Sequence, residues 1–345
     1  MNIYKYTDAI KNCRFCFMCR HLSAIGNVTF TEADTPRVRA SMIYGVTMYP
    51  ERIADKDFID TLYRSDLSRC CCFHCVNHYD ENALNIAMRT DIVEKGFAPD
   101  YVKAIAAELK ESAAWEISGK SDVLYFIDRY TAEAASVVPA FDAVMKKAQV
   151  SYATISGGCI GRALKVLGFA DDAKISAEKF VAEVKAAGAK TLVVSNPAAC
   201  ELLKHDCAEF GIEVPFKVMH TTEYIQSLNL NFSKNAGALY YLESDYLRNY
   251  DNDTVSPGAL LAALKADIKP FGTNNEESYS CGEGAVVLPK IDENLVRKLA
   301  EYVAERADDP ANDLIVTASP YTKIFLSKYT SLKVVTMEEL AAAAL

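Results

Sequence analysis

Apolar residues recur at helical spacing through about the first 118 residues of the chain. Segments 81–96 and 98–117 carry apolar residues three or four positions apart, which predicts two helices. Gly96 suits the end of the first helix, and Pro99 suits the beginning of the second. Because this part of the chain has no strong strand pattern, we expect residues 1–118 to form a helical and irregular domain.

The pattern changes after about residue 120, where short apolar runs alternate with helical segments. The runs that predict strands are 123–127, 152–156, 191–195 and 216–220. The helical segments end near 148 or cover 176–189 and 198–211. Strands that alternate with helices of this length are typical of βαβ units and of a parallel sheet.

The same order of elements then occurs a second time. The corresponding pairs are 123–127 with 238–242, 191–197 with 313–320, and 217–225 with 333–340. The copies lie about 115–123 residues apart, a spacing that indicates a duplicated domain rather than a solenoid repeat.

The predicted fold is therefore α+β, with a helical domain followed by two duplicated α/β modules. The helical domain covers residues 1–118, the first module 119–230 and the second module 231–345. Divergent duplicates usually pack about a pseudo-twofold axis, so we expect matching loops of the two modules to face one another.

Charge and hydropathy exclude several classes of partner. The net charge of −9 and the pI near 5.2 argue against a nucleic-acid partner, whose phosphates require clustered Lys and Arg. The beginning of the chain has no apolar core of a secretory signal, and no apolar run reaches the roughly 18 residues of a membrane span. We therefore expect a cytoplasmic protein without a membrane span.

Eleven cysteines in such a chain indicate metal or redox chemistry rather than a disulfide framework. Seven fall within the first 75 residues: Cys13, Cys16, Cys19, Cys70, Cys71, Cys72 and Cys75. The first three have the spacing C-x2-C-x2-C, which in a bacterial ferredoxin run continues with x3-C-P. Ser23 occupies the position of the fourth cysteine, so this run is incomplete.

Four further segments carry a resemblance to a known family. They are TPRVRA at 35–40, LYR at 62–64, GCIGRALKVLG at 158–168 and SYSCGEG at 278–284. In this order, and over nearly the whole chain, they resemble the iron–sulfur subunit of glycolate oxidase and the cysteine-rich (CCG-domain) subunits of heterodisulfide reductase. The resemblance implies a ferredoxin-like domain followed by two CCG-like α/β modules.

In a two-cluster ferredoxin, the fourth cysteine of each run binds the cluster of the other run. With that topology, counting back from Cys75 divides the ligand positions into two sets. These are Cys13, Cys16, Cys19 and Cys75, and Ser65, Ser68, Cys71 and Ser23. A serine hydroxyl stays protonated near neutral pH and is harder than the thiolate that iron–sulfur centres prefer. The resemblance therefore implies one 4Fe–4S cluster, bound by the first set.

Two alternatives for this site stay open. Zinc also accepts four cysteines, although three ligands within seven residues suit a cubane better than the paired C-x2-C knuckles of zinc. If Cys72 and Cys75 instead form a C-x2-C pair, His78 falls at the next ligand position.

The two modules show a parallel loss of cysteines. In the family, each module supplies five cysteines to a larger, non-cubane cluster, whereas here each module keeps one of them. The candidate residues that remain are Asp128 and Cys159 in the first module, and Asp245 and Cys281 in the second. We interpret the aspartates as caps of helices or turns. The alternative is that each Asp and Cys together form a metal-binding or catalytic pocket.

The resemblance implies an electron-transfer subunit of an oxidoreductase complex, since a lone cluster without a flavin or nucleotide motif needs partners. The expected partner is a flavoprotein, namely an FAD-linked 2-hydroxyacid oxidoreductase, and the expected acceptor is a small molecule such as a quinone. Two other functions stay open: a scaffold subunit with a structural cluster, and an enzyme that uses the Asp/Cys pockets on a small molecule.

Overall fold

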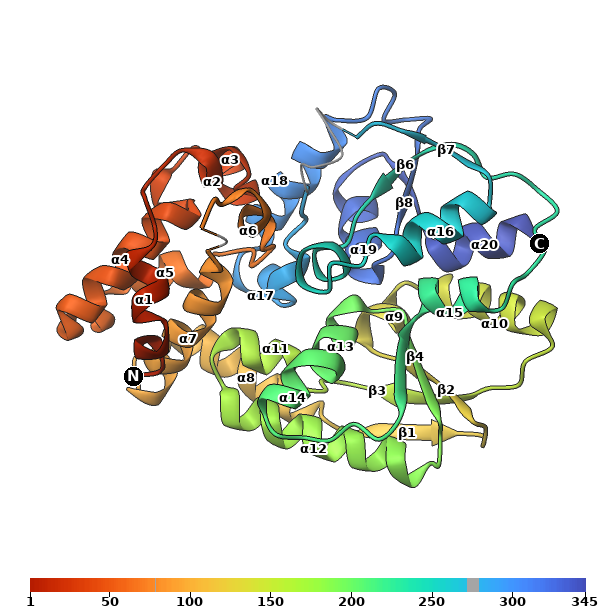
Figure 1. Cartoon of the computed structure of the whole chain (residues 1–345), viewed down its shortest axis with the longest axis horizontal. Helices are drawn as coiled ribbons and strands as arrows, with labels where there is room; N and C mark the ends of the chain where they lie inside the picture. Colours follow the sequence, from red (N-terminus) through yellow and green to blue (C-terminus); the bar gives the residue numbers. More distant parts are fainter. Residues whose placement is uncertain (78, 272–278) are drawn as a thin grey trace.

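The computed structural model describes residues 1–77, 79–271 and 279–345, and Figure 1 shows a helical part beside two α/β units. The helical part contains η1 (Asn2–Tyr6), α1 (Thr7–Lys11), α2 (Met18–His21), α3 (Ala24–Thr29), η2 (Glu32–Asp34), α4 (Pro36–Met48), η3 (Pro50–Ala54), α5 (Lys56–Tyr63), α6 (Cys70–His74), α7 (Glu81–Glu94) and α8 (Asp100–Glu111). The last two are the helices that the apolar spacing predicts.

The first module alternates strands and helices as predicted. Its elements are β1 (Trp115–Ser118), β2 (Val123–Ile127), α9 (Arg129–Glu133), α10 (Val137–Ala148), β3 (Ala153–Gly157), α11 (Arg162–Leu167), α12 (Ala170–Ala186), β4 (Thr191–Val194), α13 (Pro197–Glu201), the π-helix η4 (Leu202–Asp206), α14 (Cys207–Glu209), β5 (Lys217–His220) and α15 (Thr221–Ser227). The sheet has the order β1-β3-β2-β4-β5, and all neighbouring strands are parallel except β1 and β3.

The second module repeats this plan. Its elements are β6 (Gly237–Leu242), the π-helix η5 (Asp245–Tyr250), α16 (Val255–Ala263), β7 (Ala266–Lys269), η6 (Glu283–Ala285), α17 (Leu288–Ile291), α18 (Glu293–Ala304), β8 (Leu314–Thr317), α19 (Pro320–Tyr329), β9 (Lys333–Thr336) and α20 (Met337–Ala344). The sheet is parallel with the order β7-β6-β8-β9, which matches β3-β2-β4-β5 of the first module strand for strand. The predicted mixed fold with parallel sheets is thus observed.

Helix contacts between the modules occur in symmetric pairs. Helix α9 follows β2 and contacts α19, which follows β8. The equivalent contact joins η5, which follows β6, to α13, which follows β4. Likewise α10 packs against α20 while α16 packs against α15, and Figure 1 shows these four helices between the two sheets. Exchanging the modules exchanges the members of each pair, which is the behaviour of a pseudo-twofold axis.

The structure differs from the sequence prediction at Trp115–Ser118. The helix expected over 98–117 ends at Glu111, and β1 instead pairs antiparallel with β3. The Trp115 ring packs edge-on against Phe180 with ring centroids 5.2 Å apart, and its Nε1 donates to the carbonyl of Gly158 at 3.3 Å. These tertiary contacts outweigh the helical spacing, and the sheet of the first module begins inside the segment assigned to the helical domain.

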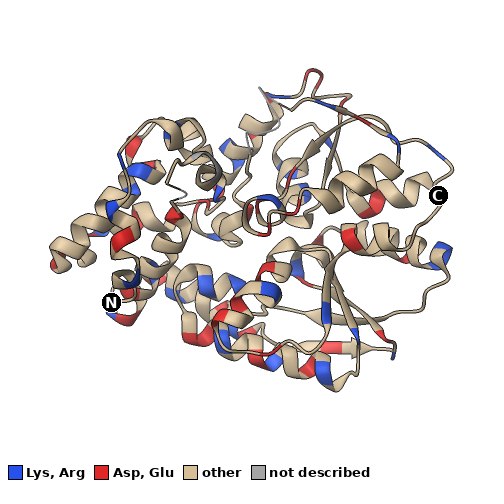
Figure 2. Cartoon of the chain, in the orientation of Figure 1, with Lys and Arg blue, Asp and Glu red and all other residues tan. Residues whose placement is uncertain are grey.

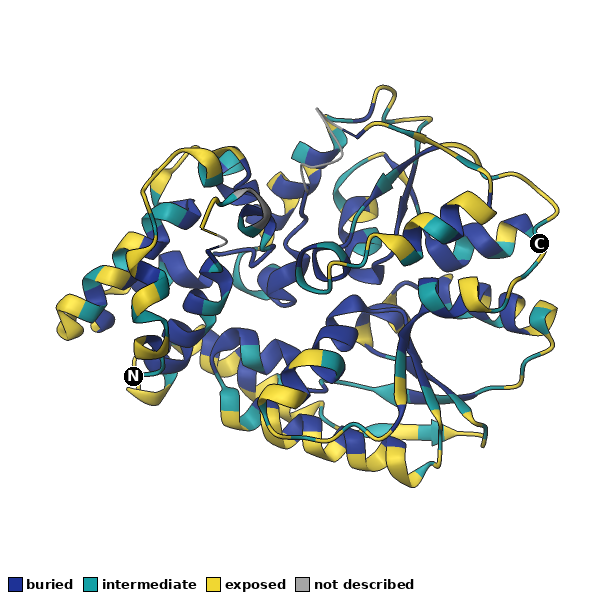
Figure 3. Ribbon diagram, viewed as in Figure 1, coloured by how far each residue is buried: buried dark blue, intermediate teal, exposed yellow. Residues whose placement is uncertain are grey.

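Buried residues are concentrated in the two sheets and at the junction between the helical domain and the two modules. Figure 3 shows buried strands, while the outer faces of α4 and α12 are exposed. On α12, acidic and basic side chains alternate along that outer face, as Figure 2 shows. One hydrophobic cluster runs from the helical domain through α11 into the helices of the second module, so the three parts share a core.

A buried arginine attaches the helical domain to the first module. The Arg89 guanidinium is fully buried and donates to the carbonyl of Val166 at 2.8 Å and to that of Leu62. The hydroxyl of Tyr63 donates to the next carbonyl, of Leu167, at 3.0 Å. These groups satisfy carbonyls at the end of α11 that have no partner inside the helix. Burial lowers the pKa of Arg89 to about 10.

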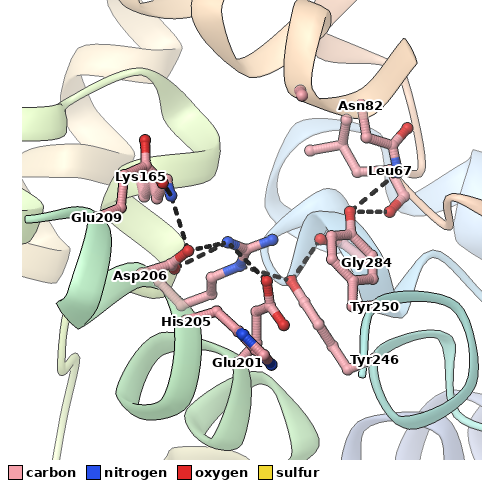
Figure 4. Close-up of polar contacts among 12 residues, drawn as sticks. Leu67, Asn82, Lys165, Glu201, His205, Asp206, Glu209, Tyr246, Tyr250 and Gly284 are labelled. Atoms are coloured by element: carbon pink, nitrogen blue, oxygen red, sulfur yellow. Dashed lines mark hydrogen bonds and ion pairs between the residues drawn. The ribbon is translucent and has the colours of Figure 1, made fainter. Parts of the chain in front are cut away.

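A second buried arginine joins the two modules, as Figure 4 shows for its neighbours. Arg162 donates through Nη1 to both carboxylate oxygens of Asp206, at 2.9 and 2.8 Å, and through Nε to the hydroxyl of Tyr246 at 3.2 Å. Tyr246 in turn donates to the carbonyl of Gly284 at 2.6 Å, and Tyr250 donates to the carbonyl of Leu67 at the same distance. The π-helix η5 therefore links the first module to the helical domain.

We expect Gly168→Ala to destabilise this junction strongly. Gly168 has φ +94°, and a Cβ added there would lie 2.4 Å from the carbonyl oxygen of Arg89. Gly188→Ala is a matched control, because Gly188 has φ +74° but nothing within 4 Å of the added Cβ. Denaturant unfolding should show a loss of about 1 kcal/mol for the control, from left-handed strain alone, and about 3 kcal/mol or more for Gly168→Ala. Equal losses would contradict the close packing.

Candidate metal centre

Four thiols from two distant segments line one cavity. Cys13 and Cys16 lie in the loop between α1 and α2, Cys19 lies on α2, and Cys75 directly follows α6. Together with Cys71 they line a cavity of about 40 Å³, which we call the thiol cavity. The structure thus brings together all four cysteines of the complete set predicted from the sequence.

Two kinds of metal site would place different demands on these thiols. Zinc needs four donor atoms about 2.0–2.3 Å from one point. A cubane cluster binds each cysteine at a separate iron, so its sulfurs surround a volume rather than a point. Within the described residues, no group of three or more Cys, His, Asp or Glu side chains is placed to hold a metal ion.

Protons must leave these thiols before a metal can bind. The pKa of Cys19 is raised to about 11, mainly by burial and in smaller part by the nearby thiols of Cys13 and Cys16. Metal ligands are thiolates, so binding at this set releases protons and becomes weaker at low pH.

The structure places Cys71 differently from the sequence prediction. The sequence assigns Cys71 to the second ligand set, whereas its side chain lines the thiol cavity. The signal was present in the sequence, because Cys71 and Cys75 are only four residues apart and lie close together when Cys71 is helical and Cys75 ends the helix. Five thiols therefore line the thiol cavity. His78, the ligand of the alternative register, lies outside the described residues.

The three serines of the second set form local hydrogen bonds. Ser23 caps α3, since its Oγ accepts from the amide of Gly26 at 3.1 Å, and it donates to the carbonyl of Asp34 at 3.1 Å. The Oγ of Ser65 accepts from the amide of Leu67 at 3.4 Å. The hydroxyl of Ser68 lies 3.3 Å from the sulfur of Cys70. All three buried serine side chains therefore make hydrogen bonds or close polar contacts within the protein.

The two arginines of TPRVRA have different environments. Arg37 lines the thiol cavity and donates to the carbonyl of Cys16 at 3.4 Å. Arg39 is buried and pairs with Glu81 at 2.7 Å, and it also donates to the carbonyl of Asp34. The first therefore adds positive charge beside the thiols, and the second mainly supports the fold around them.

Asp128 and Cys159 lie on a separate pocket of about 390 Å³ at the ends of the strands of the first module. The Oδ1 of Asp128 accepts from the amide of Thr131 at 3.0 Å, so Asp128 caps α9 as the sequence predicts. Its Oδ2 accepts from the Nδ2 of Asn196 at 2.6 Å. Burial raises the pKa of Cys159 to about 11, so this thiol stays protonated at neutral pH.

Asp245 does not cap its helix, which corrects the sequence interpretation. Ser244 is the cap of η5, and its Oγ accepts from the amide of Leu247 at 3.4 Å. The Oδ2 of Asp245 instead accepts from the hydroxyl of Ser280 at 2.6 Å and from the amide of Gly284 at 3.1 Å. Asp245 and Cys281 are both 1% exposed, and burial raises the pKa of each well above its usual value.

Glu283 completes this group, and sequence reasoning missed it. Its two carboxylate oxygens accept from the hydroxyl of Ser244 at 3.1 Å and from the amide of Asp245 at 2.7 Å. Glu283 is 3% exposed, and burial raises its pKa to about 7. Asp245, Ser280 and Glu283 thus form a buried, hydrogen-bonded group of oxygen atoms beside η5.

We expect stability to fall as the pH rises through 7 because of Glu283. A carboxyl whose pKa is raised by folding stabilises the folded state fully below its unfolded pKa near 4.5, and this contribution is lost as the pH rises through about 7. Glu283→Gln should therefore reduce the loss in the free energy of unfolding between pH 5 and pH 8, by on the order of 2–3 kcal/mol. The exposed Glu213→Gln is the control, and an unchanged pH dependence in Glu283→Gln would contradict the assignment.

No protein-family model matches the chain. The chain is 23% identical over 313 residues to a component of the dihydromethanophenazine:CoB–CoM heterodisulfide reductase of Methanosarcina acetivorans, and the alignment covers 81% of this chain and 76% of that protein. A hypothetical protein from Helicobacter pylori has a similar crystal structure, with a TM-score of 0.67 at 10% identity over 99% of this chain and 76% of the other. The second likeness concerns the mixed α/β fold alone, whereas the first is a distant relationship to one component of a heterodisulfide reductase.

Proposed function

We propose that this chain is the iron–sulfur electron-transfer subunit of an oxidoreductase complex and carries a single 4Fe–4S cluster. Cys13, Cys16, Cys19 and Cys75 would hold the cluster. The observation that carries the proposal is the thiol cavity, where cysteines about 60 residues apart in sequence meet. The distant relationship to a component of a heterodisulfide reductase supports it.

Such a cluster takes up and releases one electron at a time. The chain's own residues place the cysteines close to solvent, since Cys16 is exposed, and Arg37 offsets negative charge beside them. Asp128, Asp245 and Glu283 are committed to internal hydrogen bonds. We therefore propose that substrate chemistry belongs to a partner, an FAD-linked oxidoreductase, and that this chain accepts electrons from its flavin.

The pocket shared by Asp128 and Cys159 favours one other function, an enzyme acting on a small molecule. Asp128 would have to release Thr131 and Asn196, and Cys159 would have to lose its proton against a pKa of about 11. Both requirements make this function the weaker candidate.

Within the described residues, no helix is both long and apolar enough to cross a bilayer.

The number of irons tests the proposal directly. Protein purified without oxygen should contain about four irons per chain and give a single S = 1/2 signal after reduction by dithionite. About eight irons would mean that a second cluster survives, and one zinc without iron would overturn the electron-transfer role. The same preparation should not turn over an organic substrate unless the flavoprotein is added.

The five thiols of the cavity allow a sharp test of the ligand set. Cys75→Ser should abolish iron binding as completely as Cys16→Ser, since serine is a poor ligand for iron–sulfur clusters. Cys71→Ser should keep its iron, and so should the control Cys159→Ser in the other pocket. Iron content and the reduced spectrum are the measurements. If Cys71→Ser loses its iron and Cys75→Ser keeps it, the fourth ligand is Cys71 and the proposed ligand set is wrong.

A further inference from the structure

Exposed apolar side chains are concentrated around the thiol cavity. Fourteen large apolar side chains are exposed among the described residues, and nine of them lie within the first 76 residues. The ones nearest the cavity are Phe15, Phe17, Met18 and Val76, with exposed fractions of 52, 75, 47 and 77%. Contiguous exposed apolar groups are typical of interaction sites.

These side chains form one surface. Phe15, Met18 and Val76 line the thiol cavity itself. The Arg37 guanidinium lies over two aromatic rings, 4.5 Å from the centroid of Phe17 and 5.5 Å from that of Phe15. A second hollow of about 230 Å³, lined by Phe15 and Tyr44 among others, adjoins the cavity. We call this surface the thiol face.

The thiol face is basic although the chain is acidic. Residues 11–20 contain Lys11, Arg14 and Arg20 and have no Asp or Glu. Arg37 adds a fourth cation, and Glu32, which pairs with Arg20 at 3.0 Å and with Arg37 at 2.6 Å, is the carboxylate among them. Four cations less one carboxylate leave +3 on these side chains, against −9 for the whole chain. Four thiolates around a 4Fe–4S core would subtract about 2 from this charge, so the face stays positive. A partner that carries carboxylates is therefore attracted to this face.

We propose that the thiol face is the docking surface for an acidic, flavin-bearing protein, with Phe15, Phe17, Met18 and Val76 at its centre and Lys11 and Arg14 at its rim. The requirement that the partner carry a flavin rests on the proposed function, whereas the requirement for an apolar, carboxylate-rimmed contact rests on the face itself. Electron carriers bind through small interfaces, so a short-lived complex suits a face of this extent.

Flavodoxin, a small acidic protein that carries FMN, is the probe for this face. Binding of oxidised flavodoxin is measured by isothermal titration calorimetry on the full-length chain, so that the readout does not depend on electron transfer. We expect micromolar affinity at about 20 mM salt and a Kd at least tenfold higher at about 300 mM, because screening weakens charge pairing.

Three variants test the residues of the thiol face. Arg14→Glu and Lys11→Glu should each raise the Kd at least about fivefold at low salt, and Phe17→Ser should raise it by a similar factor without changing the salt dependence. Lys11 lies outside the cysteine run. If Arg14→Glu loses its iron, the Kd of Lys11→Glu is therefore the deciding measurement. The matched controls are Lys147→Glu on α10 and Val255→Ser on α16, both exposed residues of the modules, which should change the Kd less than twofold.

The outcomes separate this proposal from the proposed function. Absence of flavodoxin binding, or a Kd that none of the three variants changes, would overturn the docking surface while an iron content of about four per chain still supports the electron-transfer role. Salt-sensitive binding through these residues in a chain that holds no iron would support the docking surface and overturn that role.

Discussion

The buried guanidinium of Arg162 is the interaction on which the arrangement of the three parts depends. Its partners come from both modules, Asp206 from one and Tyr246 from the other, and its plane lies over the rings of Tyr246 and Tyr250. The carboxylate of Asp206 offsets the cost of burying this charge, and its pKa is lowered by the attraction of Arg162 and Lys165 despite its burial. Removal of Asp206 would leave the buried charge of Arg162 without its main partner, and removal of Tyr246 would remove the hydrogen bond from Arg162 to the second module. The relative position of the modules is therefore tied to this contact.

The same junction positions the thiols. Tyr250 contacts the carbonyl of Leu67, and Asn249 donates to the carbonyl of Ser68 at 2.8 Å, so the second module holds the segment that leads into α6. Cys71 lies on α6 and Cys75 directly follows it. Both line the thiol cavity together with the loop before α2. The thiol cavity lies in the helical domain, but its geometry depends on all three parts of the chain.

Some features of this protein could be predicted from the sequence because they depend on local pattern. Apolar runs such as 123–127 and 238–242 form strands, and their recurrence indicated two modules with the same strand order. The sequence also separated Cys13, Cys16, Cys19 and Cys75, which line one cavity, from a second set that consists mainly of serines; that these four cysteines are ligands stays a prediction. The position of Trp115 in a strand, the role of Ser244 rather than Asp245 as a cap, and the burial of Glu283 all depend on contacts between distant segments. Hydrophobic periodicity carries no information about such contacts.

The strand β1 makes the two modules unequal at their edges. In the first module it covers β3 along the side where the second module, in its described residues, ends at β7. An open strand edge is a template on which another chain can add a strand, and natural proteins protect such edges by short length and charge. Strand β7 has four residues, and its Lys269 is held by Asp313 at 2.9 Å, but Ile268 beside it is 49% exposed. On partial unfolding or at high concentration, another chain could therefore add a strand to β7 in the second module, whereas the equivalent strand β3 is already covered by β1, which is itself the edge of the first sheet.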